Sequence, residues 1–518
     1  MSNQYDKKRV VRHLGSAAIV AILGFATPAL GAPSTGDLTS ISAARGIRVQ
    51  IHASLPYGKG RLILFARPQV GTELPQAIDG NAFNREHLHL ASRDVSLTSG
   101  QSVVLDGDDN GFPTSLADLP SGIYAIQAVL DRDYNYAYAG RGPGDVITEV
   151  SHVEVLDDKI STVTLTLQQV VPPLLPWHGP WGPTANPKDL ETIQAQTDRL
   201  ALPSAHLARF WGRKIEMRAL VVRPLGYDRS TDQLPVVYLT HGFGGGLTSL
   251  EDTAAGLIRQ MKAGDMPGML WVLLDQSGPM GTHEFADSLN NGPWGTALTK
   301  ELIPFIDGKY RTDARRGARF VTGHSSGGWA ALWLQLEYPE LFGGAWSTSP
   351  DYSDFTNFGG VDLTQPNARM PDVEFARAES VLGALGGQAS SFEAVWSPRA
   401  SDGSPAQLYD RETGLVDSEV AAWWIENWDL VQKVRREWQQ RAGLLNGTLS
   451  VIVGENDEFA LDESARDLQH AIEEVSGKAS FRYLPGKGHF DLYVEGTDRA
   501  ALRRVIAWEM FAKARNDR

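Results

Sequence analysis

The spacing of hydrophobic positions differs between the two halves of the chain. From about residue 47 to residue 169, short runs alternate apolar and polar residues and are separated by turn residues. Alternation with a period of two is typical of strands that bury one face, and no convincing helical pattern interrupts it. The runs lie at 47–52, 61–66, 122–130, 152–155 and 161–167. This pattern predicts a β-sandwich-like domain over residues 32–170.

In the second half, short apolar runs alternate with longer segments of helical spacing. The apolar runs lie at 214–222, 235–240, 270–274, 319–322, 449–453 and 481–484, and helical spacing is clear at 328–334 and 418–440. Strands that alternate with helices are typical of a mostly parallel sheet covered on both faces. We therefore expect an α/β domain over residues 214–518.

Two segments do not fit either period. Residues 171–213 begin with a run rich in proline and tryptophan at 172–183, and because so many prolines cannot continue a sheet, we expect an interdomain linker. Residues 351–417 show few periodic signals and predict an insertion, which in such a domain builds a lid or a substrate pocket. An aromatic cleft and ordinary core packing both remain open as roles for Trp396, Tyr409, Trp423, Trp424 and Trp428.

One glycine-serine motif stands out in the α/β half. The pentapeptide at 323–327, Gly-His-Ser-Ser-Gly, follows a strand-like run and precedes a helical segment. A G-x-S-x-G sequence on a strand-to-helix turn presents its serine as a nucleophile. Glycines flank such a turn because a Cβ would collide with the neighbouring strand or helix. The motif predicts Ser325 as the nucleophile of an α/β-hydrolase.

A serine hydroxyl needs a base within reach and a third group that orients the base. Downstream, the run at 449–453 ends in Gly-Glu-Asn-Asp, and the run at 481–484 leads through a glycine-containing loop to a histidine. We expect Asp457 as the acid, with Glu455 as its competitor. We expect His489 as the base rather than His324, which lies beside the nucleophile in the same turn and points elsewhere.

Attack on an ester carbonyl creates an oxyanion that preorganised backbone N–H groups must stabilise. The N–H of Ser326 is expected to be one donor. The second is expected from the loop at 241–246, His-Gly-Phe-Gly-Gly-Gly, which follows the run at 235–240. Phe243 is the first choice and Gly244 the next. His241 lacks a partner at metal-ligand spacing, so we interpret it as structural support.

Taken together, these motifs resemble an esterase family of α/β-hydrolases that includes enterochelin-type esterases, feruloyl esterases, S-formylglutathione hydrolases and mycolyltransferases. The resemblance runs from about residue 210 to the C-terminus and excludes the N-terminal third and the insertion. It rests on residues 238–246, 285–288, 291–295, 301–304, 323–328, 338–344, 454–457 and 488–490. The resemblance implies an α/β-hydrolase fold, and its G-x-x-D turn favours Asp457 over Glu455 as the acid.

Polar side chains after the run at 270–274 are candidates for substrate contacts. A strand's carboxyl end in this fold opens beside the nucleophile, so Asp287, Ser288 and Asn291 are expected either to bind substrate or to hold the loop.

Two other clusters of side chains suggest metal sites only weakly. The acidic turn at 106–111 lacks the distal glutamate of a calcium loop, and His87 with His89 has no third ligand. We expect no metal.

The N-terminal residues predict export of the protein, and the composition narrows its partners and chemistry. Residues 1–31 contain Lys7, Lys8, Arg9 and Arg12, an apolar run at 14–30 and small residues before Ala32, as a cleavable secretory signal peptide does. The formal net charge of −14 becomes −17 once residues 1–31, which carry +3, are removed. So acidic a chain disfavours nucleic acid and anionic lipid as partners. The 518 residues contain no cysteine, which excludes disulfides, a thiolate nucleophile and cysteine-bound zinc.

The sequence therefore predicts a periplasmic or secreted serine esterase that acts without a cofactor through an acyl-enzyme. The expected substrate is a small-molecule or glycan-linked ester, whose acyl and alcohol groups stay open, as does the oligomeric state. Acyl transfer and peptide hydrolysis are alternatives on the same triad. A secreted glycan-binding protein with a vestigial hydrolase domain is the alternative from another class.

Overall fold

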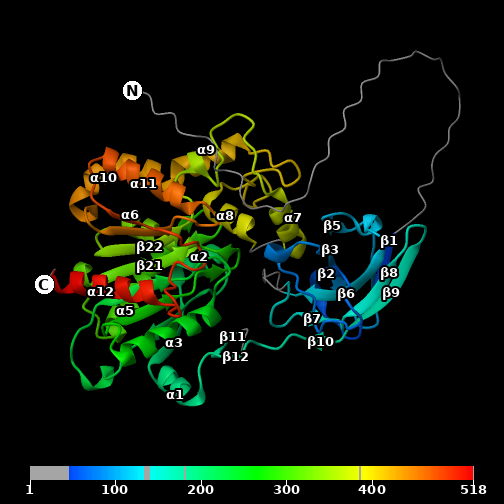
Figure 1. Ribbon diagram of the computed structural model, residues 1–518, viewed down its shortest axis with the longest axis horizontal. Coiled ribbons are helices and arrows are strands. Elements are labelled where there is room, and N and C mark those ends of the chain that lie inside the picture. The colour runs from blue at the N-terminus through cyan, green and yellow to red at the C-terminus, as the bar shows by residue number, and fades with distance from the viewer. Residues whose placement is uncertain (1–45, 133–139, 180–181, 384–386, 517–518) are drawn as a thin grey trace, which may run out of the picture. The chain divides into compact units, whose positions relative to one another are not determined.

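The computed structural model describes residues 46–132, 140–179, 182–383 and 387–516 (Figure 1). The predicted signal peptide at 1–31 lies outside the described residues. Among the helices in these ranges, none is long and apolar enough to cross a membrane.

Two packed sheets form the N-terminal part. In the smaller sheet, β1 (Gly46–Ala53) lies between antiparallel β4 (Ser102–Leu105) and parallel β9 (Ile160–Leu167). The larger sheet is centred on β2 (Gly58–Pro68) and β6 (Gly122–Asp131). Alternate residues of both sheets, among them Val49, Leu62 and Ile126, are fully buried in one shared core. The remaining strands of the larger sheet are β3 (His89–Leu97), β5 (Asn110–Phe112), β7 (Val146–Ile147), β8 (Ser151–Val155) and β10 (Gln169–Val170).

The second part is built on an eight-stranded sheet with the order β13-β14-β16-β15-β21-β22-β23-β24. From β16 to β24 every neighbouring pair is parallel, whereas β14 is antiparallel to both β13 and β16. The strands are β13 (Thr197–Pro203), β14 (Glu216–Val222), β15 (Val236–Thr240), β16 (Leu270–Leu274), β21 (Arg319–Ser325), β22 (Gly344–Pro350), β23 (Leu449–Gly454) and β24 (Ser480–Leu484).

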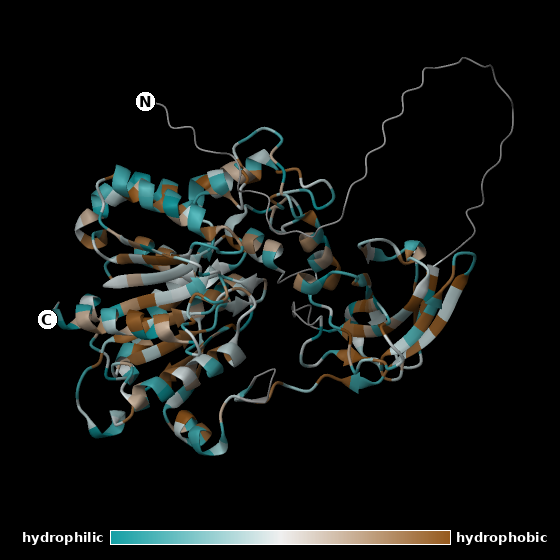
Figure 2. Cartoon of the chain, in the orientation of Figure 1, coloured by the Kyte–Doolittle hydropathy of each residue, from teal (hydrophilic) through white to brown (hydrophobic). Residues whose placement is uncertain are grey.

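Helices cover both faces of this sheet. Along β15, Val236 and Tyr238 face one core, while Val237 faces the other, as the period of two requires. In Figure 2 the central strands are largely brown or white, whereas α10 and α11 carry much teal. One core includes residues of α5 (Ile303–Lys309), α6 (Ser326–Glu337), α10 (Leu430–Leu445) and α11 (Leu461–Glu474), and the other includes residues of α1 (Pro187–Ala195), α3 (Leu247–Ala263) and α12 (Ala501–Asn516).

The sheet begins earlier in the chain than the sequence pattern predicts. Strand β13 lies inside the segment expected to be a linker and pairs along its whole length with β14. It alternates buried or half-buried residues with exposed ones because it is the edge strand, so its apolar signal is weak. Helices α1 and α2 (Ala205–Trp211) flank it, which leaves the proline-rich run as the connecting part.

The insertion after β22 contains more helix than its weak periodicity predicts. Helix α7 (Val373–Leu382) buries Ala378, Val381 and Leu382 in a core shared with β2, β3 and β6 of the N-terminal part. Arg85 pairs with Asp372, the N-cap residue of α7, at 2.8 Å. Helix α8 (Gln388–Trp396) follows, and α9 (Ser418–Asn427) comes after the insertion. The insertion is therefore packed against the N-terminal sheets.

Candidate active site

The G-x-S-x-G motif forms a tight strand-to-helix turn. Ser325 ends β21 with φ of 59°, in the left-handed region that costs energy for any residue other than glycine, and α6 begins at the next residue. A Cβ on Gly323 would lie 2.2 Å from the carbonyl oxygen of Gly327, and one on Gly327 would lie 2.6 Å from that of Thr240. Only glycine fits at these two positions, so the turn holds the strained serine at the carboxyl end of the strand.

The predicted acid and base are in contact. Asp457 lies in the turn after β23, His489 lies in the loop after β24, and Asp457 Oδ2 is 2.9 Å from His489 Nδ1. Both residues are buried, with exposures of 8% and 5%. The turn and the loop pack closely, since a Cβ on Gly454 would lie 2.2 Å from the carbonyl oxygen of Lys487. This contact leaves Nε2 of His489 as the nitrogen able to accept a proton.

The hydrogen bond changes the acidity of Asp457. Burial alone would raise the pKa of its carboxyl, but the hydrogen bond and the charge of His489, with the backbone N–H of Phe459, lower it below the ordinary value. Glu455, the competing acid, is exposed in the same turn. The geometry thus selects Asp457 as the partner of the imidazole.

The second histidine of the motif packs beside the first. The rings of His324 and His489 lie 4.4 Å apart, and Nδ1 of His324 is 3.2 Å from Thr348 Oγ1. Burial and the neighbouring His489 lower the pKa of His324 to about 3. A neutral, half-buried His324 therefore packs beside His489 and next to Ser325 in the turn.

The glycine loop after β15 lies against Ser325. A Cβ on Gly242 would lie 3.2 Å from Ser325 Cβ, which places the backbone of the loop directly beside the serine. His241 anchors the loop through Asp275 Oδ1 at 3.2 Å and the backbone N–H of Gln276 at 3.0 Å. Phe243 and the exposed Gly244 follow Gly242 in this loop, and Ser326 opens α6 on the other side of Ser325. Both predicted oxyanion donors thus lie on segments that adjoin Ser325.

The three polar residues predicted to contact substrate have partners within the protein. Asp287 in β19 (Asp287–Ser288) accepts the N–H of Thr296 at 2.8 Å. Ser288 Oγ donates to the carbonyl of Ala394 in α8 and accepts the N–H of Asn291. The Asn291 side chain is fully buried and its amide atoms have no hydrogen-bond partner. Ser288 therefore fastens the loop to the insertion, and Asn291 is the member of this group with unused hydrogen-bonding capacity.

Sequence reasoning missed one carboxyl group that contacts Ser325. Asp351, the first residue after β22, accepts hydrogen bonds from Ser325 Oγ at 3.2 Å and Ser326 Oγ at 2.6 Å. It is 5% exposed. The available signal is its place at the carboxyl end of the strand that neighbours β21, although the sequence pattern marks Asp351 only as the start of the insertion.

A second unanticipated carboxyl group lies near Asp351. Glu284 is fully buried, and neither of its carboxyl oxygens has a hydrogen-bond partner. Burial, together with the charge of Asp351, raises its pKa well above the ordinary value. Glu284 also has φ of 51°, so a buried acid is held in a strained loop between β16 and β19.

The remaining candidates have structural surroundings. The carboxylate of Asp109 in the acidic turn pairs with Arg93 and accepts the N–H of Asp106. Trp396 and Trp424 are buried in the core with their rings 5.1 Å apart. Across residues 46–132, 140–179, 182–383 and 387–516, no group of three or more His, Asp or Glu side chains is arranged to hold a metal ion.

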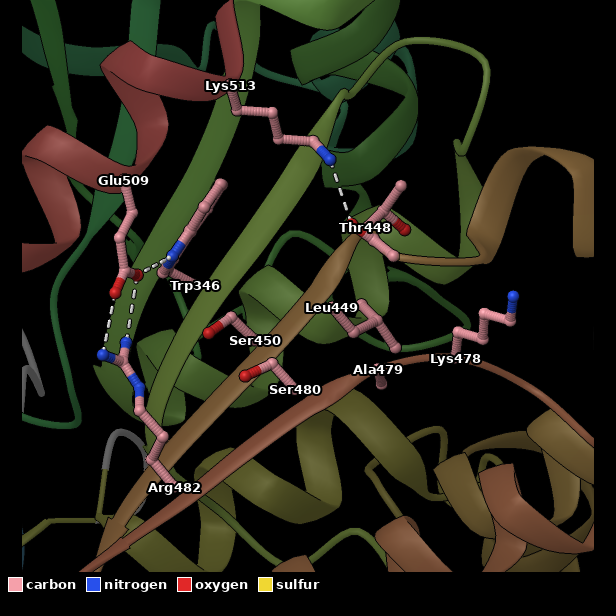
Figure 3. Close-up of a pocket in the computed structure, with 11 residues that line it drawn as sticks. Trp346, Thr448, Leu449, Ser450, Lys478, Ala479, Ser480, Arg482, Glu509 and Lys513 are labelled. Carbon is pink, nitrogen blue, oxygen red and sulfur yellow. Dashed lines mark hydrogen bonds and ion pairs between the residues drawn. The ribbon is translucent and has the colours of Figure 1, made fainter. Parts of the chain in front are cut away.

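A separate pocket of about 450 Å³ lies at the amino ends of β23 and β24 (Figure 3). Glu509 of α12 joins two of its walls, because it accepts Trp346 Nε1 at 2.7 Å and pairs with both terminal nitrogens of Arg482 at 2.8 and 3.0 Å. Lys513 donates to the carbonyl of Gly447. In this pocket, Arg482 and Glu509 are thus bound to each other, and Lys513 is bound to the backbone.

The sheet order and the strand-turn-helix at Ser325 define an α/β-hydrolase. The family model described as Putative esterase matches residues 213–504, more than half of the chain. The chain therefore belongs to this esterase family, and the predicted fold class and family are confirmed.

Individual relatives are distant. Esterase Rv1288 of Mycobacterium tuberculosis is 28% identical over 212 residues, which are 39% of this chain and 43% of that protein, so the match spans less than half of the relative's length. A solved ferulic acid esterase is 17% identical, with a TM-score of 0.41, over 62% of this chain and 99% of that chain. An S-formylglutathione hydrolase from Agrobacterium tumefaciens is 17% identical, with a TM-score of 0.38, over 62% and 94%.

Proposed function

We propose that the protein is an exported serine hydrolase that cleaves carboxylic esters through an acyl-enzyme intermediate. The observation that carries the proposal is the 2.9 Å contact between Asp457 and His489, together with the strained turn of Ser325, whose neighbour His324 has its ring 4.4 Å from that of His489. Membership of the esterase family favours an ester as the bond that is cleaved. The export part rests on the basic and apolar pattern of residues 1–31.

The proposed reaction has two halves. Ser325 Oγ attacks the ester carbonyl while His489 Nε2 takes its proton, and Asp457 holds the resulting imidazolium through Nδ1. Backbone N–H groups of Phe243 and Ser326 stabilise the oxyanion, and His489 returns the proton to the departing alcohol. Water then attacks the acyl-enzyme by the same route, which releases the acid and restores Ser325. This scheme places a nucleophile, a base and oxyanion donors on the carboxyl edge of one sheet.

The test compares two serines at opposite ends of the sheet. Hydrolysis of p-nitrophenyl esters, from acetate to longer acyl chains, is measured with the purified protein, with Ser325→Ala and with Ser450→Ala. Ser450 lies in the pocket of Figure 3, far along β23 from the predicted site. We expect Ser325→Ala to lose at least about a thousandfold in kcat, because the covalent route disappears, and Ser450→Ala to keep the parent rate.

Mass spectrometry of the protein after a fluorophosphonate treatment provides the second measurement. We expect one phosphonyl group on Ser325 in the parent protein and none in Ser325→Ala. Equal rates in the parent and Ser325→Ala, with no labelled serine, would contradict the proposal.

A further inference from the structure

The nucleophile and its neighbour share one carboxyl group. Asp351 Oδ1 accepts the hydroxyl of Ser325, Asp351 Oδ2 accepts the hydroxyl of Ser326, and the backbone N–H of Asp351 donates to the carbonyl of Ser325 at 3.3 Å. One residue after β22 thus holds the last residue of β21 and the first residue of α6. These are the nucleophile and one of the predicted oxyanion donors of the proposed mechanism.

Two carboxyl groups therefore serve the site from two neighbouring strands. Asp457 follows β23 and binds the imidazole of His489, whereas Asp351 follows β22 and binds the hydroxyl of Ser325. The charge of His489 acts on both carboxyl groups. In a buried site such an interaction is stronger than at the surface, because little water screens it.

Titratable and charged side chains from several neighbouring elements surround His489 and Asp351. His489 faces Asp457, Asp351 and the neutral His324, and Glu458 accepts its backbone N–H. Asp351 faces His489, Asp457, Glu284, Tyr352 and the two serine hydroxyls. The charge of Arg503 lowers the pKa of His324, and its guanidinium lies over the ring of Tyr493, 5.2 Å from the ring centre. The positive charge that develops on His489 is therefore the cation that interacts with Asp351.

Glu284 and Asp351 are two buried carboxyl groups that are not both charged without a large cost in free energy. The charge of one disfavours the charge of the other. Because neither oxygen of Glu284 has a partner, Glu284 is the group that keeps its proton. Burial also raises the pKa of Asp351, but the hydroxyl groups of Ser326 and Ser325 and the charge of His489 act in the opposite direction, so Asp351 is the member of the pair better able to carry the negative charge.

We infer that Asp351 is a positioning residue of the catalytic centre, which holds the Ser325 hydroxyl and brings a second carboxyl group close enough to His489 for their charges to interact. This inference rests on the proposed serine mechanism. In that mechanism the Ser325 proton moves to His489 Nε2, and the imidazolium is then stabilised by Asp457 through a hydrogen bond and by Asp351 through its charge. No other proton is transferred and no additional reactant is consumed.

The experiment is the pH profile of ester hydrolysis for Asp351→Asn. Without the negative charge, the imidazolium is less stable, so His489 remains an unprotonated base at lower pH. We expect the acid limb of kcat/KM to move to lower pH by about half a unit or more. We also expect kcat on the plateau to fall about tenfold, with KM nearly unchanged, because Asp351 acts on the transition state rather than on substrate binding.

Asp354→Asn is the matched control. Asp354 is a buried aspartate three residues further on, and it caps the short helix at 355–357 through the N–H of Thr356. Its substitution has a comparable folding cost but no charge effect on His489, so its acid limb should match that of the parent. Asp351→Ser is a second neutral variant, to be read in the same way if Asp351→Asn does not fold.

The outcomes separate the two proposals. A shifted acid limb in an Asp351 variant with a parent-like Asp354→Asn supports the inference. An unchanged limb, a rise in kcat, or a fall in activity that only follows a lower melting temperature overturns it, while Ser325→Ala still reports on the mechanism. A parent protein with no Ser325-dependent hydrolysis contradicts the proposed function itself.

Discussion

The two ends of the eight-stranded sheet differ in how far their polar groups are hydrogen-bonded. At the carboxyl end, Ser325 is strained and Glu284 is buried without a hydrogen-bond partner. At the amino end, the carboxylate of Glu509 is fully engaged by Arg482 and Trp346 (Figure 3). Unpaired polar groups and strained backbone cost stability, so proteins retain them where they have a function. Although Arg482 Nε also lacks a partner, the contrast supports the proposal that the chemistry lies at the first end and that the second end has a structural role.

The largest effect is expected from removal of the acid at the carboxyl end. Asp457→Asn keeps the shape of the side chain but no longer fixes the tautomer and charge of His489. We expect kcat for p-nitrophenyl acetate to fall by about ten-thousandfold. Glu455→Gln, in the same turn but exposed, is the control and should keep the parent rate. Equal losses in the two variants would show that the turn rather than the acid matters.

A smaller loss is expected from a methyl group added beside the nucleophile. The Cβ of Gly242→Ala would lie 3.1 Å from the carbonyl oxygen of His324 and 3.2 Å from Ser325 Cβ, so the loop or the serine must shift. We expect kcat/KM to fall about ten- to a hundredfold in steady-state assays, because small displacements disturb the attack geometry. Gly256→Ala in α3, where nothing lies within 4 Å, should leave kcat/KM unchanged and raise stability by about 0.5 kcal/mol or more.

At the amino end, the expected effect is on folding. Glu509→Gln loses the two-point pairing with Arg482, whose side chain is 31% exposed. We expect the free energy of unfolding in urea to fall by about 1 kcal/mol and kcat/KM to stay unchanged. Glu340→Gln, at an exposed position, should change neither quantity. A clear loss of activity in Glu509→Gln without a loss of stability would contradict a purely structural role for the amino end of the sheet.

The smallest effect is a pH dependence of stability from Asp457. Its folded-state pKa is lowered, although burial opposes the shift, so its contribution to stability is present above the unfolded value of about 3.9 and is lost as the pH falls through the folded-state pKa. The unfolding free energy of the parent, measured in urea from pH 6 downward, should therefore decline below about pH 4 more steeply than that of Asp457→Asn. Parallel declines would show that the His489 contact does not affect the acidity of Asp457.

Much of the site could be predicted because its signals are local in sequence. The turn at Ser325, the acidic turn with Asp457 and the loop before His489 each follow an apolar run, and parallel strands bring their carboxyl ends to one edge. The edge strand β13 could not be predicted in this way, because an edge position removes most of its apolar pattern. The polarity of Asp287 and Ser288 predicts contacts with substrate, but polarity alone does not reveal their partners inside the protein.

The sequence was enough to predict the fold class and the family, and it gave the expected order of serine, aspartate and histidine, since periodicity and turn motifs depend on neighbouring residues. Only the tertiary structure decided that Asp351 contacts Ser325 and that Glu284 lies unpaired near Asp351. It also decided that α7 of the insertion packs on the N-terminal sheets. These contacts join residues far apart along the chain, and their distances depend on strand order and register, which no local pattern specifies.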